Sequence, residues 1–125
     1  FNFIAPDELK MPDEFKLYLD NMGLKYYEHS DFTDIISKAD IIYMTRVQKE
    51  RFSDPMEYEK VKNVYVLRNS MLKNTKPNMR ILHPLPRVNE IHTDVDSSPK
   101  AYYFDQALNG VFTRQAILCY LLGIK

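Results

Sequence analysis

The stretch that decides the fold covers residues 41–51 and reads Ile41-Ile42-Tyr43-Met44-Thr45-Arg46-Val47-Gln48-Lys49-Glu50-Arg51. Its first four residues form a continuous apolar run, which is the pattern of a strand buried on both faces, as in a parallel sheet. The seven residues that follow hold three cations and one carboxylate. This change from apolar to charged residues predicts that positive charge lies at the carboxyl edge of a sheet, where ligands bind in open parallel α/β folds.

Strand-like and helix-like segments alternate along the rest of the chain. Short apolar runs predict further strands at residues 1–5, 24–27, 64–67 and 79–82. Proline, glycine and capping signals predict helices from Pro12 to Gly23, from Asp31 to Lys38 and from Asp54-Pro55 to Lys62. Further helices are predicted at 70–74 and 101–122, the last broken or bent at Asn109-Gly110. Residues 1–125 are therefore expected to form one α/β domain, a Rossmann-like three-layer sandwich with a mainly parallel sheet flanked by helices.

Composition excludes several classes of protein. Apolar residues make up 45% of the 125 residues, and Lys plus Arg and Asp plus Glu each total 17. This neutral balance argues against a nucleic-acid partner, and no apolar run approaches the roughly 20 residues that span a membrane. The single cysteine, Cys119, fits a reducing cytoplasm, and its place on an apolar helix face predicts a buried thiol. Because the chain has no initiator Met and opens in a strand, we expect it to be part of a longer polypeptide.

The charged loop 45–53 has two readings. Arg46 follows the buried strand most closely, and its guanidinium fork suits a carboxylate ligand. Gln48 would point to the same side of an extended chain, and Glu50 would hold Arg46 in place. The alternative is a solvated run of charges between a strand and a helix.

The second candidate loop follows the strand at 79–82 and begins His83-Pro84-Leu85-Pro86-Arg87. Its two prolines stiffen the backbone and leave carbonyl groups free to accept hydrogen bonds from an amide-bearing ligand. The alternative is a rigid turn that only ends the strand. The rest of this segment, to Pro99, is long and aperiodic, which is typical of functional or mobile loops.

Other patterns in the sequence give weaker evidence for a functional site. Asp94 and Asp96 lie two residues apart, but no His or Cys cluster accompanies them, so we expect no metal site. No glycine-rich nucleotide-binding motif occurs, and the sequence predicts no cofactor. Arg114, on the last predicted helix, is a further candidate cation near the site or else an ordinary surface arginine.

Taken together, residues 43–51 and 83–91 resemble the signature stretches of the aspartate carbamoyltransferase family. The second stretch reads His83-Pro84-Leu85-Pro86-Arg87-Val88-Asn89-Glu90-Ile91, with Asn89 where some members carry Asp. The similarity continues at 94–96, 101–104, 109–110 and 114–116, and residues 3–6 and 11–12 also fit. It therefore covers essentially the whole chain.

This resemblance implies the aspartate-binding half of a two-domain catalytic chain that transfers a carbamoyl group from carbamoyl phosphate to L-aspartate in pyrimidine biosynthesis. It implies that Arg46 and Gln48 bind aspartate carboxylate, with Glu50 orienting Arg46. The carbonyl groups of Pro84 and Leu85 would receive the carbamoyl amino group, and the Leu85-Pro86 bond is expected to be cis. Lys49 and Arg51, with Glu57 and Tyr58, would belong to a mobile loop that closes as aspartate binds.

The resemblance also implies groups that this sequence lacks. The family's Ser-Thr-Arg-Thr-Arg phosphate-binding motif and the catalytic histidine of its N-terminal carbamoyl phosphate-binding domain do not occur here, and a neighbouring subunit of a homotrimer donates a Ser and a Lys. Association with regulatory chains stays open. We therefore expect the isolated chain to be inactive. Two alternatives remain: an ornithine carbamoyltransferase domain, against which Pro84 in place of Cys and the cationic Arg46 argue, and a non-catalytic binding or assembly module.

Overall fold

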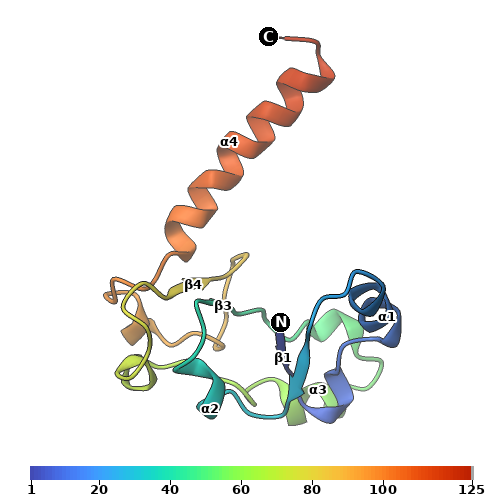
Figure 1. Cartoon of the computed structure of the whole chain (residues 1–125), viewed down its shortest axis with the longest axis vertical. Helices are drawn as coiled ribbons and strands as arrows, with labels where there is room; N and C mark the ends of the chain where they lie inside the picture. Colours follow the sequence, from blue (N-terminus) through green and yellow to red (C-terminus); the bar gives the residue numbers. More distant parts are fainter. Residues whose placement is uncertain (125) are drawn as a thin grey trace.

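The computed structural model describes residues 1–124, and its short strands alternate with helices (Figure 1). The strands are β1 (Asn2–Ile4), β2 (Tyr27–His29), β3 (Ile41–Tyr43) and β4 (Arg80–Leu82). The α-helices are α1 (Asp13–Asn21), α2 (Thr33–Ile36), α3 (Pro55–Val61) and α4 (Tyr103–Leu121). Four single-turn 3-10 helices connect them: η1 (Asp7–Leu9), η2 (Lys49–Arg51), η3 (Asn69–Leu72) and η4 (Thr93–Val95).

Local start and stop signals define the helices much as the sequence predicts. Helix α1 begins directly after Pro12 and ends just before Gly23, whose φ of +66° lies in the left-handed region that glycine adopts without cost. Helix α3 has Pro55 as its first residue, and the Asp54 carboxylate accepts a hydrogen bond of 2.8 Å from the Met56 amide. The predicted helices at 12–23 and 54–62 are therefore confirmed.

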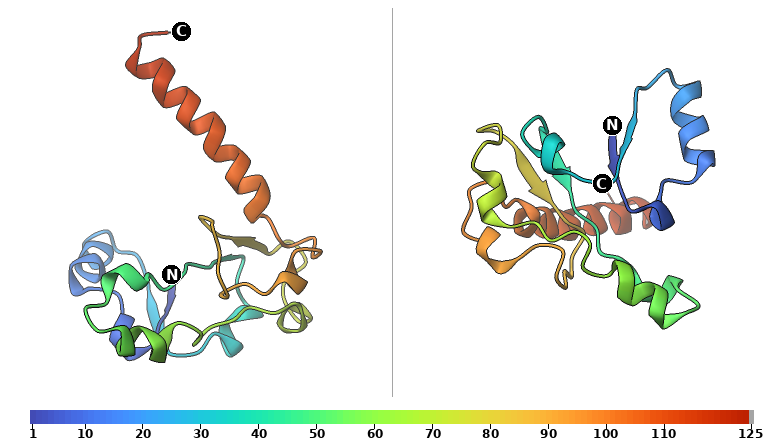
Figure 2. Two further views of the ribbon diagram at one scale, coloured as in Figure 1. Left: turned by 180° about the vertical axis from the view of Figure 1, so that it is seen from behind. Right: turned by 90° about the horizontal axis from the view of Figure 1, so that it is seen from below.

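The strands pair in parallel, which confirms the predicted α/β class. Strand β1 pairs with β2 through Phe3 opposite Glu28, and β3 pairs with β4 through Ile42 opposite Ile81. The two pairs form separate two-stranded sheets rather than the single sheet that the sequence predicts. Between them lies a mainly apolar cavity of about 660 Å³ that is lined by residues of both pairs. Figure 2 shows the two pairs as distinct units joined by the segments around them.

The strand predicted at residues 64–67 is wrong. Only Leu67 pairs, in an isolated parallel bridge with Ile91, in which its amide donates to the Glu90 carbonyl at 2.9 Å. Upstream, the Val64 amide closes a turn onto Val61, and η3 starts directly downstream at Asn69. Because turns lie on both sides of this segment, its neighbouring residues do not extend the pairing with the segment around Ile91.

A small core holds β3, β4 and the segments around them. Its fully buried members lie on β4 or on the segments that cover it: Leu67, Met79, Ile81, Ile91, Val95 and Tyr103. Ile81 lies at the centre, since its backbone binds β3 on one side and bridges Ala101 on the other. The core therefore fixes the end of β4, at which the second candidate loop begins.

Helix α4 is one unbroken helix that projects away from the rest of the chain (Figure 1). The predicted bend at Asn109-Gly110 is therefore wrong. Gly110 leaves room for the Arg114 guanidinium, because a Cβ atom at this position would lie 2.9 Å from Arg114 Nη1. Residues 111–124 are exposed throughout, including Cys119, so the predicted buried thiol is also wrong for this chain. No helix within residues 1–124 is long and apolar enough to cross a membrane.

Candidate functional site

The two candidate loops begin side by side. Strands β3 and β4 are parallel neighbours in register, and the Met44 amide donates to the Leu82 carbonyl at 2.9 Å just where both strands end. Gln106 of α4 ties the two ends together: its Oε1 atom accepts from the His83 amide at 2.9 Å and its Nε2 atom donates to the Tyr43 hydroxyl at 3.2 Å. Both loops therefore leave the carboxyl edge of one strand pair, which is the ligand-binding edge of parallel α/β folds.

Arg46 is held by the partner that the sequence predicts. Its Nη2 atom lies 3.3 Å from Glu50 Oε1, and its side chain is 37% exposed. The guanidinium is therefore oriented from one side and still open to a ligand. Gln48 keeps an extended backbone, with φ of −82° and ψ of 106°, directly before η2.

Lys49 and Arg51 lie on η2 and are exposed. The Lys49 ammonium lies 6.0 Å from the centre of the Tyr58 ring, against which Phe52 also packs edge to face. These aromatic contacts tie the charged loop to α3. Arg114 lies on the exposed half of α4, with its guanidinium over Gly110 of its own helix.

The second loop has an unusual backbone. The Leu85-Pro86 bond is cis, as expected, and Leu85 has a φ of +49°. Few residues other than glycine adopt a positive φ, and those that do are enriched at functional sites. Pro84 and Pro86 are exposed, whereas Leu85 packs against the core.

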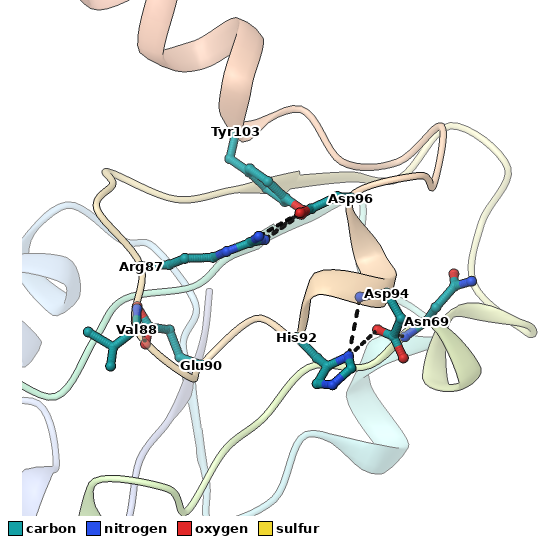
Figure 3. Close-up of polar contacts among 8 residues, drawn as sticks. All are labelled: Asn69, Arg87, Val88, Glu90, His92, Asp94, Asp96 and Tyr103. Carbon is teal, nitrogen blue, oxygen red and sulfur yellow. Dashed lines mark hydrogen bonds and ion pairs between the residues drawn. The ribbon is translucent and has the colours of Figure 1, made fainter.

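A clamp of three side chains holds the far end of this loop. Both terminal nitrogens of Arg87 bind the Asp96 carboxylate, and the Tyr103 hydroxyl donates to the same carboxylate at 2.5 Å (Figure 3). The Arg87 guanidinium holds the pKa of Asp96 below its ordinary value. Burial, and then the Asp96 carboxylate, raise the pKa of Tyr103 to about 12. Asp96 is therefore ionised and Tyr103 neutral at pH 7.

A second group of polar residues anchors η4 beside this clamp. His92 Nδ1 accepts from the Asp94 amide at 3.2 Å, and the Asp94 carboxylate accepts from the Asn69 amide at 3.1 Å (Figure 3). Asp94 and Asp96 therefore have separate structural partners. No group of three or more His, Cys, Asp or Glu side chains within residues 1–124 is arranged to hold a metal ion.

Because of this clamp, the folded chain is expected to lose stability at acid pH. Because the folded-state pKa of Asp96 lies below the ordinary 3.8, its contribution is complete above that pH and is lost as the pH falls toward the lower, folded-state pKa. Asp96 is 33% exposed, so we expect Asp96→Asn to cost only about 1 kcal/mol at pH 7 after solvent screening. Thermal unfolding measured from pH 7 to pH 2 should show the two melting curves converging below pH 4; a constant difference would contradict this role.

The fold and the two loops define a domain of the parallel α/β class that presents a cation and backbone carbonyl groups at one sheet edge. The family model for the aspartate/ornithine carbamoyltransferase Asp/Orn-binding domain matches residues 1–121, so the chain belongs to this family. The family prediction made from the two loops is confirmed.

Relatives point to the aspartate branch. The chain is 70% identical over 125 residues to the aspartate carbamoyltransferase catalytic subunit of Bacteroides thetaiotaomicron, covering 99% of this chain and 40% of that one. Identity to the Parabacteroides distasonis catalytic subunit is 67%, over 100% of this chain and 41% of the relative. The chain thus spans about two fifths of the length of the curated relatives it matches.

Solved structures agree with these relatives. The catalytic subunit of M. jannaschii aspartate transcarbamoylase matches with a TM-score of 0.85 and 41% identity, over 99% of this chain and 41% of that one. Aspartate transcarbamoylase from Trypanosoma cruzi, in complex with carbamoyl aspartate and phosphate, matches with a TM-score of 0.80 and 34% identity. The match covers 94% of this chain and 39% of that one.

Sequence reasoning missed three features of the site. These are the Gln106 bridge, the clamp on Arg87, and the buried pair formed by His83 and Glu90, whose atoms Nε2 and Oε1 lie 2.7 Å apart. The one signal available was chemical: Glu90 is a carboxylate next to apolar Ile91, and a carboxylate is buried only when it is paired.

Proposed function

We propose that the complete polypeptide transfers the carbamoyl group of carbamoyl phosphate to L-aspartate, giving N-carbamoyl-L-aspartate and phosphate, and that this chain supplies the aspartate-binding half of the site. The observation that carries the proposal is Arg46, held by Glu50 at the edge where β3 and β4 end, beside the loop of Pro84 and Leu85. The 70% identity to an aspartate carbamoyltransferase catalytic subunit supports it.

Arg46 suits the acceptor substrate. Its guanidinium forms two parallel hydrogen bonds with one carboxylate, and Gln48, two residues further on, provides an amide donor to the same ligand. A cation here attracts the dicarboxylate aspartate and repels the side-chain ammonium of ornithine. Lys49 and Arg51 add positive charge on the exposed turn η2. The resemblance to the family implies that this loop closes as aspartate binds.

Pro84 and Leu85 suit the donor substrate. Their carbonyl groups accept hydrogen bonds from the amino group of carbamoyl phosphate, which fixes the carbamoyl carbon beside the aspartate amine. The amine nitrogen forms a bond to this carbon, the bond from carbon to the phosphate oxygen breaks, and the amine releases a proton. Positioning of the two substrates supplies most of the catalysis in this half of the site.

Phosphate binding belongs to the rest of the polypeptide. The chain spans about two fifths of its relatives, and the exposed end of α4 carries a run of large apolar side chains: Val111, Phe112, Ile117, Leu118, Leu121 and Leu122. Exposed apolar surface of this kind marks an interaction site. We propose that the N-terminal carbamoyl phosphate-binding domain of the same chain covers it, in a cytoplasmic homotrimer to which regulatory chains can be added.

Acceptor choice tests this function. In the complete polypeptide, carbamoyl phosphate should transfer its carbamoyl group to L-aspartate, with no product from L-ornithine under the same conditions. The 125-residue chain alone should form no N-carbamoyl-L-aspartate above the uncatalysed rate, because it lacks the phosphate-binding groups. Transfer to ornithine, or to neither amino acid, would overturn the proposed function.

A further inference from the structure

The ring of His83 is buried between two polar partners. The residue is 1% exposed. Its Nδ1 atom lies 2.8 Å from the Leu85 amide nitrogen, and its Nε2 atom lies 2.7 Å from Glu90 Oε1. A backbone amide only donates, so Nδ1 must accept, and the ring proton is therefore on Nε2 and points to Glu90. With both nitrogens occupied inside the core, the imidazole does not reach a substrate.

Glu90 fixes this tautomer. Its carboxylate also accepts hydrogen bonds from the backbone amides of Val88, at 3.1 Å, and Asn89, at 3.0 Å. Burial would raise the pKa of Glu90, but hydrogen bonds from its own backbone amide, from His83 and from the Val88 amide outweigh it and hold the pKa below the ordinary value. Figure 3 shows the Glu90 side chain reaching back to the Val88 backbone. Glu90 is therefore a fixed acceptor for the His83 ring.

The hydrogen bond from Leu85 sets the direction of the Pro84 carbonyl. The peptide between Pro84 and Leu85 is trans, so its N–H and C=O groups point in opposite directions within one rigid plane. Because the N–H group points inward at His83, the carbonyl points outward, on the exposed side of Pro84. Leu85 has a φ of +49°, a conformation that costs a leucine about 1–2 kcal/mol. The hydrogen bond to His83 and the packing of the Leu85 side chain against the core offset this cost.

We propose that His83, oriented by Glu90, is a positioning residue for carbamoyl transfer, because it aims the Pro84 carbonyl at the amino group of carbamoyl phosphate. This inference rests on the proposed function. If the hydrogen bond is lost, Leu85 relaxes toward an extended conformation and the peptide plane turns. The carbonyl then no longer faces the substrate, although Arg46 and Gln48 keep their places on the other loop.

Two uncharged substitutions test the roles of the two ring nitrogens separately. In His83→Asn, the side-chain oxygen takes the place of Nδ1 and keeps an acceptor for the Leu85 amide, but the donor to Glu90 is lost. In His83→Gln, the side-chain nitrogen takes the place of Nε2 and keeps the donor to Glu90, but the acceptor for Leu85 is lost. Each variant removes one buried hydrogen bond, so a purely structural role predicts equal effects.

The kinetics of the complete polypeptide decide between these roles. We expect His83→Gln to lower kcat about 100-fold, the usual effect of misplacing a reacting group by about 1 Å. It should also raise the KM for carbamoyl phosphate and leave the KM for L-aspartate near that of the unmodified polypeptide. His83→Asn should keep a kcat at least about tenfold higher than that of His83→Gln, a ratio that corresponds to one hydrogen bond.

Three outcomes are informative. Equal kcat values for two variants of similar melting temperature, or a slower His83→Asn, would overturn the positioning role while the proposed function stands. An unmodified polypeptide that does not carbamoylate aspartate overturns the proposed function itself. If His83→Gln does not fold, His83→Asn is compared with the unmodified polypeptide: a kcat within about tenfold supports the role, because the acceptor for the Leu85 amide is kept, and a loss of about 100-fold in a folded variant refutes it.

Discussion

Arg46→Ala, in the complete polypeptide, is expected to raise the KM for L-aspartate on the order of 100-fold while carbamoyl phosphate binds as before. Hydrogen bonds to a charged group are worth about 1.5–3 kcal/mol each. At about 1.4 kcal/mol per tenfold change, the loss of the two parallel bonds from Arg46, each at the low end of this range, gives the expected effect. Arg46 is oriented by Glu50 and its side chain is 37% exposed, so a ligand carboxylate can reach the open side of the guanidinium. Initial rates at varied L-aspartate and saturating carbamoyl phosphate measure the effect.

Two matched variants make this result specific. Arg46→Lys keeps the positive charge but loses the planar fork, so its KM should fall between those of the unmodified polypeptide and the alanine variant. Arg80→Ala removes an exposed arginine from the amino end of β4, opposite the edge that carries the two loops, and should leave the KM unchanged. A normal KM for L-aspartate in Arg46→Ala would show that the loop does not bind the acceptor, whatever the fold.

Local signals predicted much of the fold, because their physical causes lie within a few residues. Proline fixes its own φ and lacks an amide hydrogen, so Pro12 and Pro55 marked helix starts that the structure confirms. The apolar run at 41–44 predicted a parallel strand buried on both faces. Strand β3 occupies its first three residues and is parallel, but Ile41 and Tyr43 are exposed, so the predicted burial on both faces is wrong for this chain. Glu50 lies four residues after Arg46, so their ion pair also depends only on short spacing.

Features that depend on distant partners escaped prediction. Leu67 pairs only with Ile91, so an apolar run at 64–67 did not become a strand. A glycine in a helix is destabilising on average, yet Gly110 continues α4 and makes room for Arg114. The extent of each sheet depends on which strands meet, and the apolar pattern of single strands does not encode this.

In the candidate site, too, residues with local signals were predicted and residues that depend on distant partners were missed. Arg46 and the loop of Pro84 and Leu85 were found because both follow strand ends and because their sequences resemble one family. Gln106 was missed because it lies 23 residues from His83, and nothing in its neighbourhood marks it as a bridge. The partner of Arg87 was missed because Asp96 lies nine residues further along the chain and was considered only together with Asp94, as a possible metal ligand.

Ile81→Ala is expected to destabilise the chain by about 2–5 kcal/mol, because removing a large aliphatic side chain from a packed core leaves a cavity. Ile81 is fully buried at the middle of β4, where its backbone contacts β3 on one side and residues 100–102 on the other. Urea-induced unfolding, followed by circular dichroism, measures the change in the free energy of unfolding.

Ile41→Ala is the matched control, since it makes the same substitution on the neighbouring strand. Ile41 is 60% exposed, so its loss should cost less than about 1 kcal/mol. A difference of at least 1 kcal/mol between the two variants is expected, with similar dependence on urea concentration. Equal destabilisation would mean that β4 is not the centre of the core. Because β4 ends one residue before His83, the geometry of the Pro84 and Leu85 loop would then need a different anchor.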